Sequence, residues 1–189
     1  MFVGSLQTKL FYENEVNFVT IDVETASTAV SSICQVGLVK YVNGQPVETY
    51  SSLVMPNVEF NKYNVAVHGI TEDMVADAPE MKEIYDDLLA FVGNNVLVSY
   101  SNFDKRALRG CAADYNLKAP PMLWADAHVM LKNKYPQYAK KGSNLANICK
   151  EWGFSFQNHD ALEDAKACGF ITSKILTEHN MSINDWARA

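Results

Sequence analysis

The chain has 189 residues, of which 48% are hydrophobic and 20% are charged, and its formal net charge is −6. This composition is ordinary for a soluble globular protein, and the length suits one domain with a hydrophobic core better than two. The acidic balance excludes a protein that coats nucleic acid with a basic surface, so any nucleic-acid role must depend on a small local site helped by cations.

We expect neither a membrane-spanning segment nor a signal peptide in this sequence. No apolar run approaches the length of a membrane span, and the N-terminus lacks the basic and apolar stretches of a signal peptide. The four cysteines, at 34, 111, 149 and 168, show no C-x-x-C spacing, which favours reduced thiols over disulfides or a zinc site. We therefore expect a cytoplasmic protein without a membrane partner. Because no linker or repeat interrupts the chain, we expect one domain over 1–189, with its motif-bearing core at about 16–178.

Extended patterns dominate the first part of the chain. Three strands are predicted there, over 16–24, 33–42 and 47–54. Asn43-Gly44 lies between the second and third strands and is a strong hairpin signal, so these strands should be antiparallel. A loop region follows, and then a short helix near 71–75 for which Thr71 is the expected N-cap.

Helices and strands alternate in the rest of the chain. Pro79 is expected to open a helix with regular apolar spacing, which Gly93 ends. The elements expected after it are a strand over 96–100, a helix over 103–115, a strand over 122–125, a helix through 131, a helix capped by Ser143 and a long helix over 161–178. This order predicts an α/β fold with helices on both faces of the sheet.

Acidic residues lie at the expected carboxyl ends of two strands. Asp22 and Glu24 are two apart on the first strand, so both side chains point to one face. Asp104 follows the strand over 96–100 and falls in the first turn of a helix. Taken singly, the strand-end pair could simply reach solvent, and Asp104 could be an ordinary helix N-terminal acid. Open α/β sheets, however, build their sites at the carboxyl ends of strands.

The pattern His-x-x-x-Glu-Asp occurs twice, once from His68 to Asp73 and once from His159 to Asp164. The first copy lies in a loop before a short helix, where its acids read as ordinary first-turn residues. The second copy begins a long apolar helix, which is the rigid support that a site requires. We therefore assign the chemistry to His159 and Asp164.

Four acids in one cleft need neutralising cations. Asp22, Glu24, Asp104 and Asp164 cannot all be ionised together unless divalent ions lie among them. Oxygen ligands select Mg²⁺ or Mn²⁺ over zinc, and two such ions form the usual clamp for in-line displacement at phosphorus. A histidine beside them, His159, can deprotonate a water molecule near neutral pH.

Taken in order, these segments resemble the motifs of a known family. Asp22-x-Glu24, Asn102-Phe103-Asp104 and His159-x-Ala161-x-x-Asp164 are similar to the three motifs of the DEDDh exonucleases. These are DnaQ-like enzymes that include the proofreading epsilon subunit of bacterial DNA polymerase III. The segment 67–71, Val-His-Gly-Ile-Thr, also resembles one common in the epsilon-like branch, which explains the first histidine copy as a feature outside the metal site.

The resemblance implies a ribonuclease H-like fold: a five-stranded mixed sheet in the order 3-2-1-4-5, with the second strand antiparallel to its neighbours. It also implies hydrolysis of single-stranded DNA or RNA from the 3′ end, releasing nucleoside 5′-monophosphates. By this resemblance Asp22, Glu24 and Asp164 hold one metal ion, and Asp22 also reaches a second with Asp104 contributing through water. His159 would be the general base.

Two positions depart from the family pattern. Many relatives have Thr-Thr-Gly where this chain has Thr-Ala-Ser at 25–27, and many have His-Asn where it has Ser-Tyr at 99–100. Neither departure removes an expected metal ligand, but both concern how the terminal nucleotide is held. The substrate-binding residues that we expect are Thr25, Ala26 and Phe103.

Three functions remain open on the sequence. DNA is the favoured substrate of an exonuclease here, because segment 67–71 resembles the epsilon-like branch. An RNA-trimming exoribonuclease or oligoribonuclease is the alternative within the superfamily. A non-catalytic binding module on the same fold is a third reading, disfavoured because all five catalytic positions are present.

A possible partner motif lies at the N-terminus. Residues 7–11, Gln-Thr-Lys-Leu-Phe, fit a loose pattern like that with which proteins bind bacterial sliding clamps. The same apolar residues could instead pack at the edge of the domain. A polymerase or clamp is therefore a candidate partner, beside the nucleic-acid 3′ end itself.

Overall fold

The computed structural model describes residues 16–119, 122–139 and 142–188. Five strands form one sheet in the order β3-β2-β1-β4-β5. They are β1 (Phe18–Thr25), β2 (Ile33–Val42), β3 (Gln45–Leu53), β4 (Leu97–Ser99) and β5 (Trp124–Asp126). β2 is antiparallel to β1 and β3, whereas β4 is parallel to β1 and β5 is parallel to β4. The strand order and directions predicted for the mixed sheet are confirmed.

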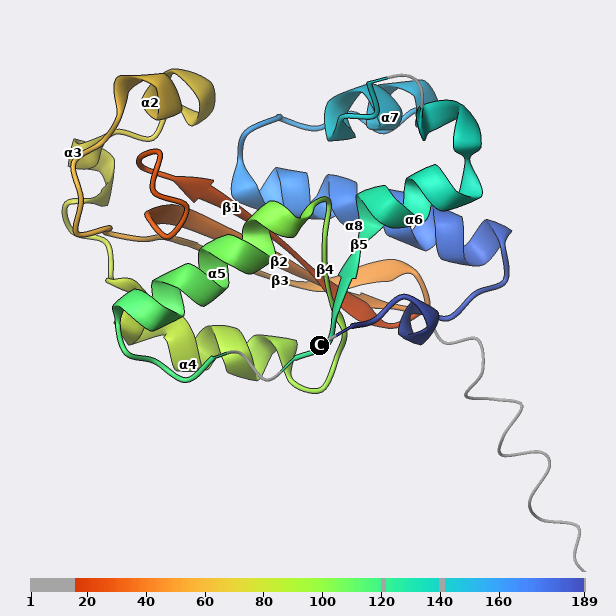
Figure 1. Ribbon diagram of the computed structural model, residues 1–189, viewed down its shortest axis with the longest axis horizontal. Helices are drawn as coiled ribbons and strands as arrows, with labels where there is room; N and C mark the ends of the chain where they lie inside the picture. The colour runs from red at the N-terminus through yellow and green to blue at the C-terminus, as the bar shows by residue number, and fades with distance from the viewer. Residues whose placement is uncertain (1–15, 120–121, 140–141, 189) are drawn as a thin grey trace, which may run out of the picture.

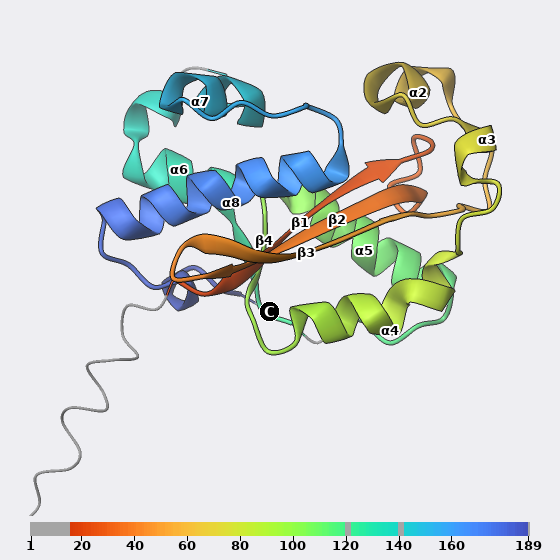
Figure 2. The same ribbon diagram turned by 180° about the vertical axis from the view of Figure 1, so that it is seen from behind.

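Helices cover both faces of this sheet (Figures 1 and 2). In chain order they are α2 (Lys62–His68), α3 (Glu72–Val75), α4 (Met81–Val92), α5 (Asn102–Asp114), α6 (Ala127–Lys134), α7 (Leu145–Trp152) and α8 (Ala161–Glu178), with short 3₁₀ helices η1 (Pro136–Ala139) and η2 (Ile183–Asp185). One hydrophobic core joins the sheet to α4 and α5, and a second joins it to α6, α7 and α8. Within the described ranges, no helix combines the length and apolarity that crossing a membrane requires.

β1 divides its side chains between the two cores. Val19, Ile21 and Val23 face the core under α4 and α5, whereas Phe18 belongs to the core under α8. Because side chains alternate along a strand, Asp22 and Glu24 share the face of Phe18 and point toward α8. The alternation thus anchors the strand on one side and directs both acids to the other.

The β2–β3 hairpin turns as its sequence predicts. Asn43 and Gly44 have φ values of 52° and 74°, the left-handed conformation that both central residues of a type I′ turn require. Val42 pairs with Gln45 across the turn, so β3 begins at Gln45, two residues earlier than predicted.

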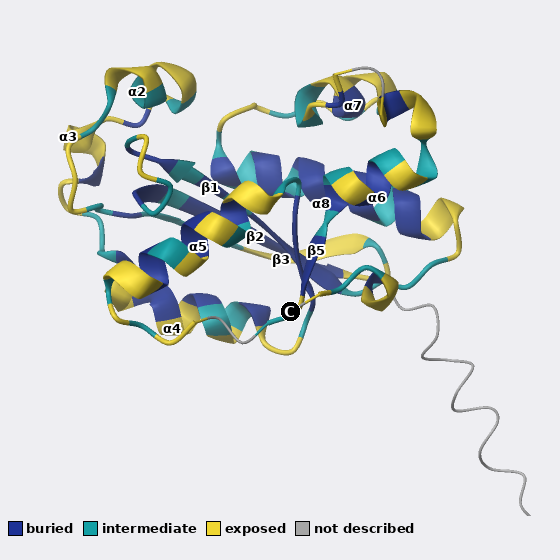
Figure 3. Ribbon diagram, viewed as in Figure 1, coloured by how far each residue is buried: buried dark blue, intermediate teal, exposed yellow. Residues whose placement is uncertain are grey.

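The structure contains a helix, α2, that the sequence did not reveal. None of its residues is buried, so it lacks the apolar periodicity from which a helix is recognised (Figure 3). The short helix α3 lies where it was predicted, and Thr71 occupies its N-cap position. The Thr71 side chain, however, makes no capping hydrogen bond there.

Two predicted helix starts were wrong by one or two residues. Pro79 lies before α4 rather than inside it, and the N-cap is Glu80, which forms a capping box with Glu83. Asn144, not Ser143, caps α7. The Ser143 hydroxyl lies 2.6 Å from His128 Nε2 instead, so a tertiary contact replaces the expected cap.

Two glycines let α8 lie unusually close to β2. A Cβ atom on Gly37 would be 2.4 Å from the backbone carbonyl carbon of Ala161, and one on Gly169 would be 2.1 Å from the Tyr41 ring. Both distances are shorter than any real Cβ contact. A larger residue at position 37 would therefore push the helix away from the sheet, and one at position 169 would displace the Tyr41 ring or the helix.

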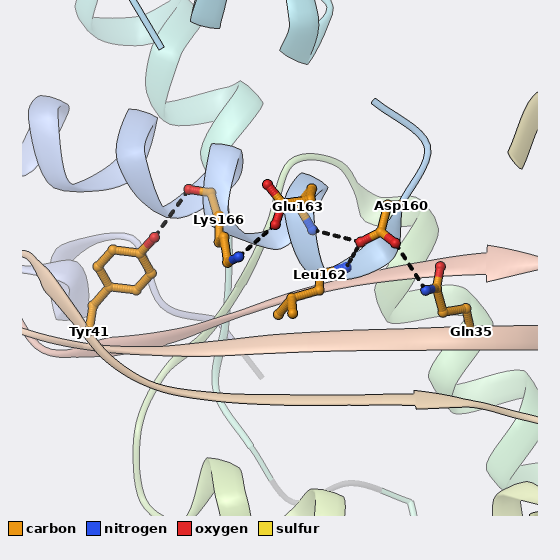
Figure 4. A network of polar contacts seen from close by, with 6 residues as sticks. All are labelled: Gln35, Tyr41, Asp160, Leu162, Glu163 and Lys166. Atoms are coloured by element: carbon orange, nitrogen blue, oxygen red, sulfur yellow. Dashed lines mark hydrogen bonds and ion pairs between the residues drawn. The ribbon is translucent and has the colours of Figure 1, made fainter. Parts of the chain in front are cut away.

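Polar contacts fix the first turns of α8 over the same strand (Figure 4). The Gln35 side chain accepts the Ala161 N–H at 3.0 Å and donates to Asp160 Oδ2 at 3.3 Å. Asp160 Oδ1 in turn accepts the N–H groups of residues 162 and 163, both at 3.1 Å. Further along, the Tyr41 hydroxyl donates to the Lys166 carbonyl at 3.1 Å. The start of α8 is thereby held in register with β1 and β2.

Candidate active site

A cleft of about 480 Å³ opens where β1 and β4 end and α5 and α8 begin. Six of the residues singled out in the sequence border it: Asp22, Glu24, Phe103, Asp104, His159 and Asp164. They come from three segments separated by more than 50 residues each, and the sheet order brings those segments together.

The α5 helix places Asp104 directly against β1. Ser101 caps the helix by accepting the Phe103 N–H at 3.1 Å, which puts Asp104 in the first turn. Asp104 Oδ1 accepts the Val23 N–H at 3.1 Å. Four residues earlier, the Val19 N–H donates to a backbone carbonyl at the start of β4, at 3.0 Å. The Asp104 carboxylate thus continues the hydrogen bonding of the β1 edge beyond the point where β4 stops.

The first turn of the α8 helix places Asp164 at the cleft. Its side chain is 5% exposed, and Oδ2 accepts the backbone N–H of His159 at 2.7 Å. His159 has a φ of 66°, a left-handed conformation that non-glycine residues seldom adopt. This local turn keeps the backbone of His159 on Asp164 while its side chain is exposed at the cleft.

Three donor groups lie close enough to share one ion. One ligand atom from each of Glu24, His159 and Asp164 lies within 4.8 Å of the other two. Asp22 and Asp104 border the same cleft but are not in this closest group of the described residues. The set therefore offers two carboxylates and an imidazole at one point, with two further carboxylates beside it.

The pKa of each of the four carboxyl groups in the cleft is raised above its usual value. Burial is the main cause, and it raises the pKa of Glu24 and of Asp104 to about 7 and that of Asp164 to about 6. Burial and the neighbouring carboxylates raise the pKa of Asp22 well above its usual range. Each acid opposes the ionisation of the others. At neutral pH the cluster can carry its full negative charge only if cations enter the cleft.

The first histidine copy lies on the other side of the β1 end. His68 Nδ1 accepts the Ile70 N–H at 3.0 Å, so the ring proton is on Nε2, which donates to the Thr25 carbonyl at 3.2 Å. The Asn64 amide donates to the same carbonyl at 2.8 Å. Of the two copies, the structure places only the second at the cleft, since neither His68 nor Asp73 borders it.

Two of the three expected substrate-binding residues do not line the cleft. Thr25 is 6% exposed and Ala26 is fully buried, and neither is among the described residues that border it. Their backbone carbonyls instead receive hydrogen bonds from the α2 region, including Asn64 to Thr25 and Asn61 to Ala26. Phe103, the third, borders the cleft and is 37% exposed.

The cleft also contains residues that were not among the expected site residues. Tyr100, noted in the sequence only as a departure from the family pattern, borders the cleft. Its hydroxyl donates to the Ser143 carbonyl at 2.7 Å, and its ring stacks on His128 with 5.2 Å between the ring centres. The other polar residues of the cleft that were not expected there are Ser101, Asn144, Asn147 and Asn158. Asn144 could have been found as a helix cap, whereas Asn147 and Asn158 carry no local signal of a site.

Comparison with known proteins gives a consistent result. The RNase_T family model, described as an exonuclease, matches residues 19–171. The PolC-type DNA polymerase III of Clostridium perfringens is 33% identical over 160 residues, which cover 82% of this chain and 11% of that protein. The corresponding protein of Oceanobacillus iheyensis is 29% identical over 168 residues, 86% of this chain and 12% of that protein. The chain thus spans about one eighth of the length of these relatives.

Solved structures share the fold. Exonuclease X in complex with 5′ overhanging duplex DNA superposes with a TM-score of 0.75 at 22% identity, covering 90% of this chain and 97% of that one. The nuclease domain of 3′hExo, a DEDDh family member bound to rAMP, gives 0.76 at 19% identity and covers 88% and 94%. At these identities the likeness establishes the fold, which is the ribonuclease H-like one expected.

Proposed function

Since this chain belongs to the exonuclease family whose model matches residues 19–171, we propose that it removes nucleotides from the 3′ ends of single strands. The products are nucleoside 5′-monophosphates, and the preferred strand is DNA. The observation that carries the proposal is the convergence of Asp22, Glu24, Asp104, His159 and Asp164 on one cleft.

The donor set fits Mg²⁺ or Mn²⁺. Oxygen ligands predominate, and the carboxyl pKa values are raised by burial first and by the neighbouring carboxylates second, so divalent cations would stabilise the ionised cluster. We assign the metal-binding role to Asp22, Glu24, Asp104 and Asp164, in a site for two ions. When bound, such ions neutralise charge on the phosphate and lower the pKa of a water molecule.

His159 is assigned the role of general base. Its ring nitrogen lies within 4.8 Å of carboxylate oxygens of Glu24 and Asp164, so a water molecule held by these acids is within its reach. Asp164 accepts the His159 backbone N–H and thereby fixes the turn that carries the ring. The proton taken from the water moves to the imidazole, which is exposed and can pass it to solvent.

The exposed Phe103 ring at the mouth of the cleft suits contact with a terminal base. The preference for DNA is supported by the relatives, which are DNA polymerases. The same relatives support a polymerase as a partner of this chain. The clamp-binding pattern expected at residues 7–11 lies outside the described residues.

End-labelled strands test the proposal directly. DNA and RNA of one sequence, each labelled at the 5′ end, are incubated with the protein in EDTA, Mg²⁺ or Mn²⁺. We expect a ladder of products shortened from the 3′ end, formed with either metal and absent in EDTA, and faster on DNA. Faster degradation of RNA would favour the exoribonuclease alternative. Binding of strands without shortening in any metal would support the non-catalytic module instead.

A further inference from the structure

A second hollow adjoins the cleft at the β5 edge of the sheet. It has a volume of about 330 Å³ and lies between the start of α5, strand β5 and the start of α6. Ser101, the N-cap of α5, borders both the cleft and this hollow, so the two adjoin at the start of α5. We call it the edge groove, and it is lined by Ser101, Asn102, Lys105, Trp124, Asp126, Val129, Trp186 and Arg188.

The C-terminal end of the described chain completes the edge groove. Trp124 and Arg188 exchange two backbone hydrogen bonds, at 2.8 and 2.9 Å, so this tail lies antiparallel to β5 (Figure 1). The pairing holds the tail against the sheet edge, where Trp186 and Arg188 both line the groove. Lys134 lies over the Trp186 ring at 5.7 Å from its centre.

The edge groove has the charge that a phosphodiester strand requires. Its lining contains two cations, Lys105 and Arg188, and one acid, Asp126, so the groove has a formal charge of +1 in a chain of −6. The Arg188 guanidinium donates to two backbone carbonyls and pairs with no carboxylate of the described residues. The one acid in the groove, Asp126, accepts the Val129 N–H at 2.9 Å as the cap of α6, which offsets part of its charge.

The edge groove also offers apolar and aromatic surface for bases. Val129 is 51% exposed, and Trp186 is half-buried in the wall. Aromatic side chains beside cations are the usual equipment of proteins that hold single strands without reading their sequence. Cations for phosphates and a ring for a base thus occur together, next to the cleft.

Resting on the proposed function, we propose that the edge groove binds the part of the strand on the 5′ side of the scissile bond. The reaction releases one nucleotide at a time from the cleft, so the rest of the strand must leave the cleft along the surface. Arg188 and Lys105 contact its phosphates, and the Trp186 ring contacts a base. The C-terminal tail therefore sets how strongly longer strands bind.

Another hollow adjoins the cleft but lacks this chemistry. It borders the cleft at Asn147, and its lysine, Lys150, is accompanied by Glu151. The two charges cancel, so this second exit offers a strand no net attraction. Lys150 is accordingly the matched control for the cations of the edge groove.

The test compares a long substrate with one too short to reach the edge groove. The long one is single-stranded DNA of about ten nucleotides, and the short one is a nitrophenyl ester of thymidine 5′-monophosphate. The readout is the ratio of kcat/KM on the long substrate to kcat/KM on the short one. We expect Trp186→Ala to lower this ratio about tenfold, through a raised KM on the long strand, and Trp186→Phe to retain most of it.

Arg188→Gln tests the phosphate contact with little risk to folding, since its backbone pairing is retained. We expect a lower ratio and a salt dependence of binding to the long strand whose logarithmic slope is smaller by about 0.7. Lys150→Gln should leave both unchanged.

Two results separate the possible failures. Suppose first that the wild-type protein hydrolyses both substrates. If the Trp186 and Arg188 variants then keep the wild-type ratio of kcat/KM on the long and short substrates, the edge groove is not the strand path. The same conclusion follows if Lys150→Gln lowers this ratio. Equal losses on both substrates would mean that the tail is structural only, and would also overturn it. If the wild-type protein hydrolyses neither substrate, the proposed function itself is wrong.

Discussion

The two copies of His-x-x-x-Glu-Asp have the same spacing and opposite fates. Asp164 lies in α8, an 18-residue helix with ten buried residues, and His159 lies two residues before this helix begins. His68 is the last residue of α2, which has none, and Asp73 is exposed in the four-residue helix α3. Both copies approach the end of β1, but only the α8 copy enters the cleft.

The difference lies in what each helix rests on. α8 is pressed against β2 at Gly37 and Gly169 and is tied to it through Gln35, so the position of Asp164 is fixed by the sheet. α2 is tied to the sheet by side-chain hydrogen bonds from Asn64 and His68 to the carbonyl of Thr25, the last residue of β1. Of the two copies, only the one supported by a buried helix reaches the cleft.

Exchanging the acid in each copy should produce the largest contrast. Asp164→Asn removes a charge from the cluster but can still accept the His159 N–H, so the fold should be retained. We expect 3′ shortening in Mg²⁺ to fall by at least about a thousandfold, because several kcal/mol of charge stabilisation are lost. Asp73→Asn should change it by less than about twofold. An essential Asp73 with a dispensable Asp164 would mean that the histidine copies are assigned the wrong way round.

Exchanging the histidines should give the next largest contrast. His159→Asn removes the proposed base, and we expect kcat near neutral pH to fall by about 10²–10⁴-fold with a smaller change in Mg²⁺ affinity. His68→Asn removes a hydrogen bond to Thr25, worth about 1 kcal/mol, and should lower activity by less than about tenfold. Single-turnover rates and metal titrations measure the two effects separately. Unchanged turnover of the His159 variant would eliminate the general-base role.

The supporting glycines should differ in the cost of an added methyl group. Gly37→Ala places Cβ 2.4 Å from backbone atoms of Ala161, so the free energy of unfolding should fall by about 1–3 kcal/mol or more, and activity should fall with it. At Gly69, beside His68, no atom lies within 4 Å and only the left-handed φ of 76° opposes alanine, at about 1 kcal/mol. Gly142, with open space and no such φ, is the control. Denaturant unfolding measures all three, and equal losses at Gly37 and Gly142 would show that α8 is not so tightly placed.

The smallest expected effect is a change in the stability of the folded protein with pH in the absence of metal. The pKa of Glu24 and of Asp104 is raised to about 7 and that of Asp164 to about 6 in the folded protein, so folding favours their protonated forms. Their contribution to the free energy of unfolding is fully present at pH values below the usual carboxyl pKa range, and it is lost as the pH rises through 6 to 7. In EDTA, Tm should therefore fall between pH 5 and pH 8.

Variants and metal identify the source of this loss. Asp164→Asn should reduce the fall in Tm, Asp73→Asn should not, and Mg²⁺ should restore Tm more at pH 8 than at pH 5. A wild-type Tm in EDTA that rose between pH 5 and pH 8 would contradict this prediction. An equal fall in Tm in the wild-type protein and in both variants would show that Asp164 is not a source of it.

The sequence by itself determined the sheet, the family and six of the residues at the cleft. Alternation on β1, the Asn43-Gly44 turn and the apolar face of α8 are local patterns, and each survives because burial and backbone conformation enforce it residue by residue. The choice of the α8 copy over the His68 copy was also available, because helix length and apolarity are visible in one dimension.

Only the tertiary structure decided the rest. The exposed helix α2, the Tyr100–His128–Ser143 contacts and the edge groove depend on residues distant in sequence that carry no periodic signal. Thr25 and Ala26, expected at the substrate, are buried beneath the α2 contacts, which no motif could reveal. Local sequence fixes which face a side chain takes on its own element, whereas the packing of elements decides what that face meets.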